Sequence, residues 1–215
     1  MLIDGKALWL AQTNTYVVAL EPAAMAIVID APPDAAGVSA LLAKHGLTPV
    51  ALLVTHGHVD HVGGAGEFVR SADISAYVHP DDDFLTMHPD DQLRQLFGGV
   101  PAGDFAPPDH FENLADGDRL QLAGLEISVI HTPGHTPGHC CFRLVDEGTL
   151  FSGDQLFAGS IGRTDLPGGS FEALMASMTE KILTLDDDMD VLPGHGPATT
   201  VGRERRTNPF LTGLA

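Results

Sequence analysis

Residues able to do chemistry gather in four short polar segments of this 215-residue chain. The densest, His56-Gly57-His58-Val59-Asp60-His61, offers three imidazoles and one carboxylate within six positions. The other three segments centre on His135, Asp154 and His195. Neutral imidazoles and carboxylates suit Zn²⁺, Fe and Mn²⁺, and a site that needs several of them must recruit them from different segments. Because chance rarely produces such spacing, the pattern predicts a metal site.

The four segments occupy equivalent places, since each follows a strand-like apolar run. In an open α/β sheet, side chains just beyond the carboxyl ends of strands line one crevice, so segments far apart in sequence can meet there. Glycine and proline flank nearly every candidate ligand, which favours tight turns and lets the backbone approach an ion closely. We therefore expect the seven candidate side chains to converge on one site held by rigid turns.

The elements that must position these turns alternate between strands and helices. Apolar, β-branched runs predict strands at 7–10, 16–20, 25–30, 50–55, 74–79, 120–121, 125–131, 140–145, 149–152 and 189–192. Helical spacing of apolar residues covers 37–45, 64–71, 90–97 and 171–183, the last as an amphipathic face. This mixture predicts a layered α/β fold with sheets inside and helices outside, as a single domain over residues 1–215.

Residues 80–118 form the one irregular stretch, rich in Asp, Pro and Gly with dispersed phenylalanines. A connection of this length is usually functional or disordered, and its phenylalanines indicate that it packs on something. We expect a lid over the site, with a mere covering loop as the alternative.

The charge balance excludes some partners. A count of 29 acidic against 11 basic residues gives a formal net charge of -18, and no basic run is strong enough to offset that field for a nucleic acid. Polar residues interrupt the N-terminal apolar run, so neither a signal peptide nor a membrane span is expected. Adjacent Cys140 and Cys141 rarely form a mutual disulfide, which fits a cytoplasmic protein. The expected partner is a small molecule, and the oligomeric state stays open.

Other residues receive plainer interpretations. Strand alternation predicts that one of Cys140 and Cys141 points inward and the other outward. The aspartate runs at 81–83 and 186–188 are typical of solvated loops, and the arginines within 203–206 are expected to pair with the acidic surface. The aromatic residues Trp9 and Tyr16 are expected in the core or at the rim of the site.

Taken together, the four segments resemble those of the metallo-β-lactamase superfamily of metal-dependent hydrolases. The resemblance runs from Thr13–Tyr16 to Thr207–Phe210 and implies an αββα four-layer sandwich with the site along one sheet edge. It also implies two divalent metal ions, Zn²⁺ first, with Fe or Mn as alternatives. By that resemblance, one ion takes His56, His58, His135 and Asp154. The other takes Asp60, His61, His195 and Asp154, so that Asp154 bridges the two.

A second stretch narrows the resemblance. Gly153–Phe157, followed by Gly162–Gly169, is similar to glyoxalase II-like thioester hydrolases, also called hydroxyacylglutathione hydrolase-like. This implies a binuclear metallohydrolase that cleaves a 2-hydroxyacyl thiol such as S-lactoylglutathione through a metal-bridging hydroxide. Persulfide dioxygenases share the Gly-Arg-Thr-Asp turn but use one iron, and they are the alternative. Zinc β-lactamases commonly carry cysteine where Asp154 stands, which disfavours antibiotic hydrolysis, and the acidic charge disfavours a nucleic-acid-processing or non-enzymatic member.

Further roles follow around the metals. Asp60 is expected to act as a catalytic residue that orients the attacking water. His131 or His139 is expected to hold the metal ligands in place without binding a metal itself. Arg163 is a candidate for binding an anionic tail of the substrate, because a guanidinium fork fits carboxylates. The alternative is a structural pair between Arg163 and Asp165.

Overall fold

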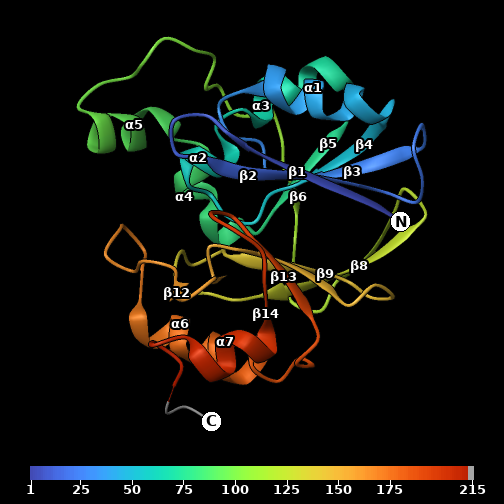
Figure 1. The fold of residues 1–215 in the computed structure, drawn as a ribbon. Helices are drawn as coiled ribbons and strands as arrows, with labels where there is room; N and C mark the ends of the chain where they lie inside the picture. Colours follow the sequence, from blue (N-terminus) through green and yellow to red (C-terminus); the bar gives the residue numbers. More distant parts are fainter. Residues whose placement is uncertain (213–215) are drawn as a thin grey trace.

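Two six-stranded sheets form the centre of the molecule in a computed structural model that describes residues 1–212 (Figure 1). The first sheet contains, in order across it, β1 (Leu2–Leu8), β2 (Thr13–Ala19), β3 (Met25–Ile29), β4 (Thr48–Leu53), β5 (Ser75–Val78) and β6 (Glu112–Asn113). The second contains β14 (Thr199–Thr200), β13 (Asp190–Pro193), β10 (Thr149–Gly153), β9 (Cys140–Leu144), β8 (Leu125–His131) and β7 (Arg119–Leu122). A separate hairpin joins β11 (Leu156–Phe157) and β12 (Ser160–Ile161).

Helices cover the outer face of each sheet (Figure 1). The first sheet carries α1 (Ala35–His45) and α3 (Ala65–Ala72). The second carries α6 (Phe171–Ser177), the π-helical turn η2 (Met178–Ile182) and α7 (Val201–Thr207). Shorter elements lie beside the site, namely α2 (Val59–Val62), the 3-10 turn η1 (Pro80–Asp82), α4 (Asp83–Thr86) and α5 (Pro89–Phe97). The four predicted helices are present, while α7 was not predicted.

Three buried apolar clusters hold the layers together. Between the sheets, Ile27 and Leu53 of the first sheet meet Phe142 of the second, all fully buried. The outer clusters pack Phe68 of α3 on the first sheet and Met178 of η2 on the second. Each such side chain contributes about 1.5–3 kcal/mol by leaving water. The αββα four-layer sandwich of the prediction is confirmed.

The predicted strand at 7–10 is displaced. The first strand is β1, which ends at Leu8, and Trp9 follows it in a turn with a φ of 59°. A positive φ takes a residue out of the extended conformation, so the chain turns back into β2 at this point. Because β1 is an edge strand with several exposed positions, it lacks the apolar run that would mark it in the sequence.

Alternation along β9 places the two cysteines on opposite faces of the sheet, as predicted, but neither face is exposed to water. Both are free and fully buried in β9, since Cys140 faces the core between the sheets and Cys141 faces the helices on the outer side. Alternation along a strand puts one residue in water only where one face of the sheet is solvated. Here both faces of the second sheet are covered.

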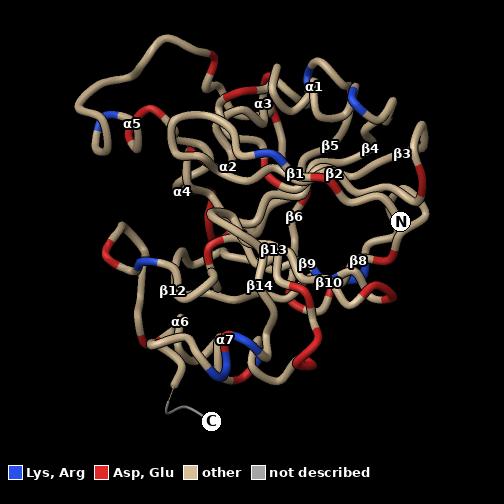
Figure 2. The backbone as a smooth tube through the Cα atoms, viewed as in Figure 1, with Lys and Arg blue, Asp and Glu red and all other residues tan. Residues whose placement is uncertain are grey.

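Asp and Glu are far more frequent along the chain than Lys and Arg (Figure 2). Arg205 and Arg206 both pair with Asp187, which confirms the expected pairing for two of the three arginines within residues 203–206. Within residues 1–212, none of the helices is long and apolar enough to cross a bilayer. Residues 80–118 contain η1, α4 and α5 before the chain reaches β6, and their role as a lid stays a prediction.

Candidate metal centre

The four polar segments meet at one edge of the sandwich. Residues 56–61 follow β4, His135 follows β8, Asp154 follows β10 and His195 follows β13. The turns after β4 and β10 therefore bring ligands from the two different sheets to one place. All seven predicted side chains come together, in two clusters that share Asp154.

The first cluster contains three imidazoles. His56 Nε2 lies 3.1 Å from His58 Nδ1 and 3.2 Å from His135 Nε2, and the last two atoms are 2.9 Å apart. Asp154 Oδ2 lies 3.5 Å from His135 Nε2. Nitrogens that bind a tetrahedral ion at about 2.0–2.1 Å are about 3.3 Å from one another, so this spacing suits a metal of that size.

The second cluster contains two imidazoles and two carboxylates. His61 Nε2 lies 3.3 Å from His195 Nε2 and 3.4 Å from Asp154 Oδ1. Asp60 Oδ2 lies 3.2 Å from His195 Nε2 and accepts a hydrogen bond of 3.1 Å from Thr13 Oγ1. Asp154 thus contacts both clusters, because Oδ1 faces His61 while Oδ2 lies between His135 and His195, 3.7 Å from His195 Nε2.

The electrostatics of the first cluster fit a cation. Burial, followed by the neighbouring His135, lowers the pKa of His58 to about 3, and burial with the surrounding imidazoles holds the pKa of His56 well below its usual range. Both rings are therefore neutral near pH 7, and each can offer a ring-nitrogen lone pair toward the space between them. Asp154 Oδ1 is buried without a hydrogen bond. Burying these ring nitrogens and this carboxylate oxygen costs free energy unless a positive ion lies between them.

The second cluster needs positive charge for a different reason. Burial alone would lower the pKa of His61, but the carboxylates of Asp154, Asp60 and Asp30 raise it well above its usual value. Burial is the largest single influence on the pKa of Asp60 and raises it, but His61 and His195 together lower it further, to about 2. The carboxylates are therefore ionised and attract either a proton on His61 or a divalent cation in its place.

Asp30 holds His61 from behind and was missed in the sequence. Its Oδ2 atom lies 2.7 Å from His61 Nδ1, and its Oδ1 accepts a 2.7 Å hydrogen bond from the Thr55 amide. A carboxylate on the far nitrogen of a ligand histidine fixes the ring orientation and tautomer. Asp30 directly follows β3 and stands alone between Ile29 and Ala31, so only its place next to β4 reveals the role.

Asp82 corrects the prediction that residues 81–83 are a solvated run. Its side chain is fully buried and accepts hydrogen bonds from Gly57 N at 2.7 Å, Thr136 Oγ1 at 2.7 Å and Gly138 N at 2.6 Å. Burial raises the pKa of this carboxyl, while the three donors act in the opposite direction. Asp82 therefore joins the turn that carries His56 and His58 to the turn that carries His135.

Gln92 makes the equivalent connection from α5. Its Oε1 accepts from Val59 N at 3.0 Å, and its Nε2 donates to Gly57 O at 2.9 Å and to Leu85 O at 3.0 Å. These contacts fix the main chain on both sides of His58. Breaking these hydrogen bonds would leave buried polar groups without partners, which costs free energy. Gln92 therefore holds α5 and the metal-binding turn together as one unit.

Of the two histidines expected behind the ligands, His139 lies there. Its Nε2 accepts from Asp154 N at 3.0 Å, and its Nδ1 lies 2.8 Å from Thr132 Oγ1. His131 instead stacks on His79, with ring centroids 4.0 Å apart and planes 5° apart, and donates to a main-chain carbonyl. Although these two rings lie close to Asp81, the lone pairs of parallel stacked rings do not converge on a point, so this group is a poor metal site.

Arg163 takes part through its main chain. Its carbonyl accepts a 2.7 Å hydrogen bond from His135 Nδ1, which orients that ring. Its guanidinium donates two hydrogen bonds of 2.7 Å to the two carboxylate oxygens of Asp165, and both side chains are largely exposed. The structure thus contains the structural pair that was the alternative to substrate binding.

Two residues of β2 hold the turn that carries His195 through hydrogen bonds. Tyr16, which is buried, donates from its hydroxyl to Pro193 O at 2.8 Å, and Asn14 Nδ2 donates to Pro193 O and Gly196 O at 2.9 Å. A Cβ atom at Gly194 would collide with Asp154 Oδ1 and with the ring of His61. Only glycine lets the backbone pass this close to the ligands.

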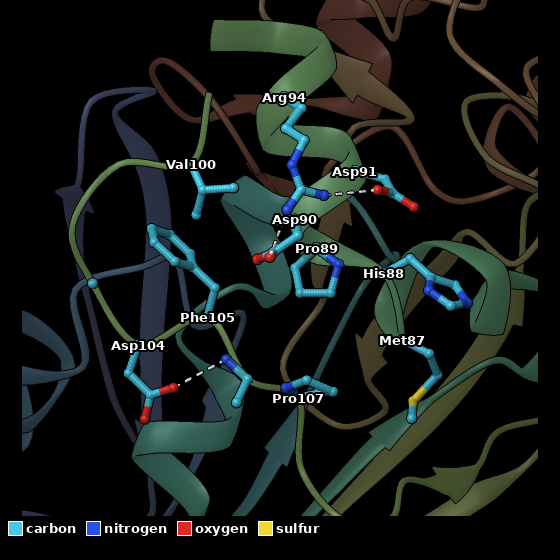
Figure 3. A pocket seen from close by; sticks show the side chains of 12 residues that line it. Met87, His88, Pro89, Asp90, Asp91, Arg94, Val100, Asp104, Phe105 and Pro107 are labelled. Carbon is cyan, nitrogen blue, oxygen red and sulfur yellow. Dashed lines mark hydrogen bonds and ion pairs between the residues drawn. The ribbon is translucent and has the colours of Figure 1, made fainter. Parts of the chain in front are cut away.

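A pocket of about 450 Å³ opens directly over the ligands His58, Asp60, His135, Asp154 and His195. A larger hollow of about 670 Å³ lies beside α5, where Arg94 pairs with Asp90 and Asp91 and Phe105 closes one side (Figure 3). None of the seven predicted ligands lines that hollow. The smaller pocket is therefore the one that belongs to the metal centre.

The αββα fold and the two His/Asp clusters define a metal-binding protein of the metallo-β-lactamase type. The family model of the metallo-beta-lactamase superfamily matches residues 8–195, and the chain belongs to this superfamily. The hydroxyacylglutathione hydrolase GloC of Haemophilus influenzae is 41% identical over 160 residues, which is 74% of each chain.

Two solved structures are similar over nearly the whole chain. The BLEG-1 B3 metallo-beta-lactamase has a TM-score of 0.90 at 38% identity and covers 99% of this chain and 100% of its own. TTHA1623 in a di-iron-bound form has a TM-score of 0.86 at 40% identity, with 97% and 100% covered. The His/Asp clusters and the di-iron neighbour support divalent metals in this chain as well.

Proposed function

We propose that this protein is a binuclear metallohydrolase that cleaves a thioester, with a 2-hydroxyacyl thiol such as S-lactoylglutathione as the first substrate to test. The observation that carries the proposal is the pair of complete ligand clusters that share Asp154. In this assignment His56, His58 and His135 hold one ion and Asp60, His61 and His195 the other. The relative from Haemophilus influenzae, a hydroxyacylglutathione hydrolase, supports the choice of substrate class.

The chemistry divides between the metals and the chain. Two bound divalent ions would supply an acidified water as nucleophile and a Lewis acid for the thioester carbonyl. Asp60, held by Thr13, orients the attacking water above the ligands. Asp30 and the Arg163 carbonyl keep the rings of His61 and His135 in place. The partner is a small molecule, and neither a nucleic acid nor a membrane has a part in the reaction.

The decisive experiment combines metal analysis with turnover. Natively purified protein is analysed for metal content per chain and then incubated with S-lactoylglutathione while the thioester absorbance is followed. We expect about two metals per chain, Zn²⁺ or Fe, and loss of absorbance that a chelator abolishes. Two bound metals without thioester turnover would contradict the proposal.

Two parallel assays address other reactions. One iron per chain together with oxygen uptake on glutathione persulfide would instead favour the persulfide dioxygenase alternative. A β-lactam is assayed as well, because one of the similar structures is a metallo-beta-lactamase. Hydrolysis of the β-lactam faster than of the thioester would replace the proposed substrate class.

A further inference from the structure

The wall of the pocket above the metal centre is apolar. It is formed by side chains from three separate places, the turn after β1, the end of α5, and the β11–β12 hairpin with the loop that follows it. These side chains are Trp9, Leu96, Phe97, Phe157, Ile161 and Leu166. Trp9 and Phe97 meet edge to face with centroids 5.7 Å apart, and Phe157 lies 6.2 Å from the ring of His195. Any group bound beside the metals therefore contacts aromatic and aliphatic carbon.

The apolar wall stays open to a ligand. Phe97 is 51% exposed and Leu96 is 45% exposed, although both line the pocket. Large apolar side chains on α5 would normally turn toward the core, where Leu93 of the same helix is fully buried. Since removing apolar carbon from water favours binding, the exposed side chains of Leu96 and Phe97 leave binding free energy available to an apolar ligand.

Cationic side chains are scarce in this pocket. Among residues 1–212, Arg163 is the only Lys or Arg that lines it, and Asp165 already accepts both hydrogen bonds of its guanidinium. Arg94, on α5, faces the other hollow and pairs with Asp90 and Asp91 (Figure 3). Apart from the metals, a thiol with carboxylates, such as glutathione, therefore has no free cationic side chain to pair with among the described residues, and the acidic field of the protein repels it. The charged half of such a thioester lies outside the pocket.

The remaining half of the substrate must then occupy the pocket. A lactoyl group presents only a methyl to the wall and would leave most of the 450 Å³ unfilled. A phenyl or branched side chain would contact Trp9, Phe97 and Phe157 together. Resting on the proposed thioester hydrolysis, the geometry points to a substrate whose acyl group carries a bulky, uncharged, apolar side chain, selected by the wall of Trp9, Leu96, Phe97 and Phe157.

The kinetic test uses two thioesters that differ only in this side chain. S-mandeloylglutathione carries a phenyl where S-lactoylglutathione carries a methyl, and both are 2-hydroxyacyl thioesters of the same thiol. We expect kcat/KM of the metal-loaded protein to be at least about tenfold higher for the mandeloyl compound, because the pocket gains contacts worth more than one methylene.

A binding test separates recognition from turnover. Trp9 is the only tryptophan of the chain, so its fluorescence reports on the pocket without interference. The thioethers S-phenacylglutathione and S-acetonylglutathione repeat the phenyl and methyl pair but cannot be hydrolysed. We expect the phenacyl compound to shift or quench Trp9 emission with a Kd about tenfold lower.

Two alanine variants localise the effect. In Phe97→Ala the preference for the phenyl compounds should fall by about threefold to tenfold in both tests. Phe171→Ala is the matched control, because Phe171 is 57% exposed at the start of α6 and does not line the pocket. It should leave both preferences unchanged.

The outcomes distinguish the two proposals. Phenyl preference in both tests, reduced by Phe97→Ala alone, supports the inference and the hydrolase together. Tighter phenacyl binding without any thioester turnover supports the apolar pocket and contradicts thioester hydrolysis. Turnover of both thioesters with equal kcat/KM and equal thioether affinities would leave the hydrolase standing and overturn the inference.

Discussion

The metal-binding turns at the base of the pocket, called the floor here, and the apolar wall above them, called the rim, are held in place by different interactions. On the floor, His56 and His61 are fully buried, and carboxylates, amides and hydroxyls hold the turns around them at every step. On the rim, Leu96 and Phe97 are half exposed and held only by apolar contact. Position is thus fixed around the predicted ligands, whereas the substrate selection proposed above rests on half-exposed side chains.

The largest effect is expected for the bridging carboxylate of the floor. In Asp154→Asn a neutral amide faces both clusters, so at least one metal per chain should be lost and kcat/KM should fall by about 100-fold or more. Metal analysis and the thioester assay measure the two quantities. Asp165→Asn, on the exposed neighbouring loop, is the control and should keep its metals. Full metal content in Asp154→Asn would exclude the bridging role.

The floor can also be weakened without touching a ligand. Because both oxygens of Asp82 accept from N–H or O–H donors, the amide of Asp82→Asn must point one donor at another. We expect a loss of about 1–3 kcal/mol in the free energy of unfolding and about 10–100-fold weaker metal binding. Urea unfolding and competition with a chelator measure these effects. Asp81→Asn, at an exposed position beside it, should change neither, and equal losses in both variants would rule out a specific role for Asp82.

Gln92 connects the floor with the rim, so its loss should affect both to a smaller degree. Gln92→Leu replaces the amide with a shorter apolar side chain and leaves Val59 N and Gly57 O without their partner. We expect kcat/KM to fall by about tenfold, mainly through KM, and hydrogen exchange in α5 to accelerate. Gln95→Leu, on the exposed side of the same helix, is the matched control. Unchanged exchange in Gln92→Leu would show that α5 is held by its apolar contacts alone.

The smallest effect belongs to a charged residue of the rim. The guanidinium of Arg163 is already neutralised by Asp165, and the part that touches the site is a main-chain carbonyl that alanine retains. In Arg163→Ala, KM for a carboxylate-bearing thioester should change by less than about twofold, as steady-state kinetics will show. A tenfold rise in KM would restore Arg163 as a substrate-binding residue.

Some site residues could be predicted from the sequence and others could not, and the two groups differ in how far along the chain their partners lie. The ligand segments are recognisable because their histidines, aspartates and glycines stand within a few positions of one another after strand-like runs. Asp82, in contrast, acts on Gly57 and Gly138, which are 25 and 56 residues away, and Gln92 acts on Val59, 33 residues away. An isolated acid or amide in a polar stretch carries no local sign of such partners.

The same limit applied to the prediction of the fold. Helix periodicity and apolar runs were sufficient for the layers, because both depend on neighbouring residues. The position of Trp9 depended on a single left-handed residue, and the burial of Cys141 depended on helices that come later in the chain. Neither could be deduced from strand alternation alone.

The ligands of the second cluster lie far apart in the sequence, so the ribosome makes them at different times. His61 meets His195, which is 134 residues further along the chain, and Asn14 meets the same turn 182 residues later. At translation rates of about 5–20 residues per second, residues 56–61 wait on the order of ten seconds for their last partner. The ligand set of the second cluster is therefore incomplete until residue 195 has been made, and this metal site can be completed only after both sheets have been synthesised.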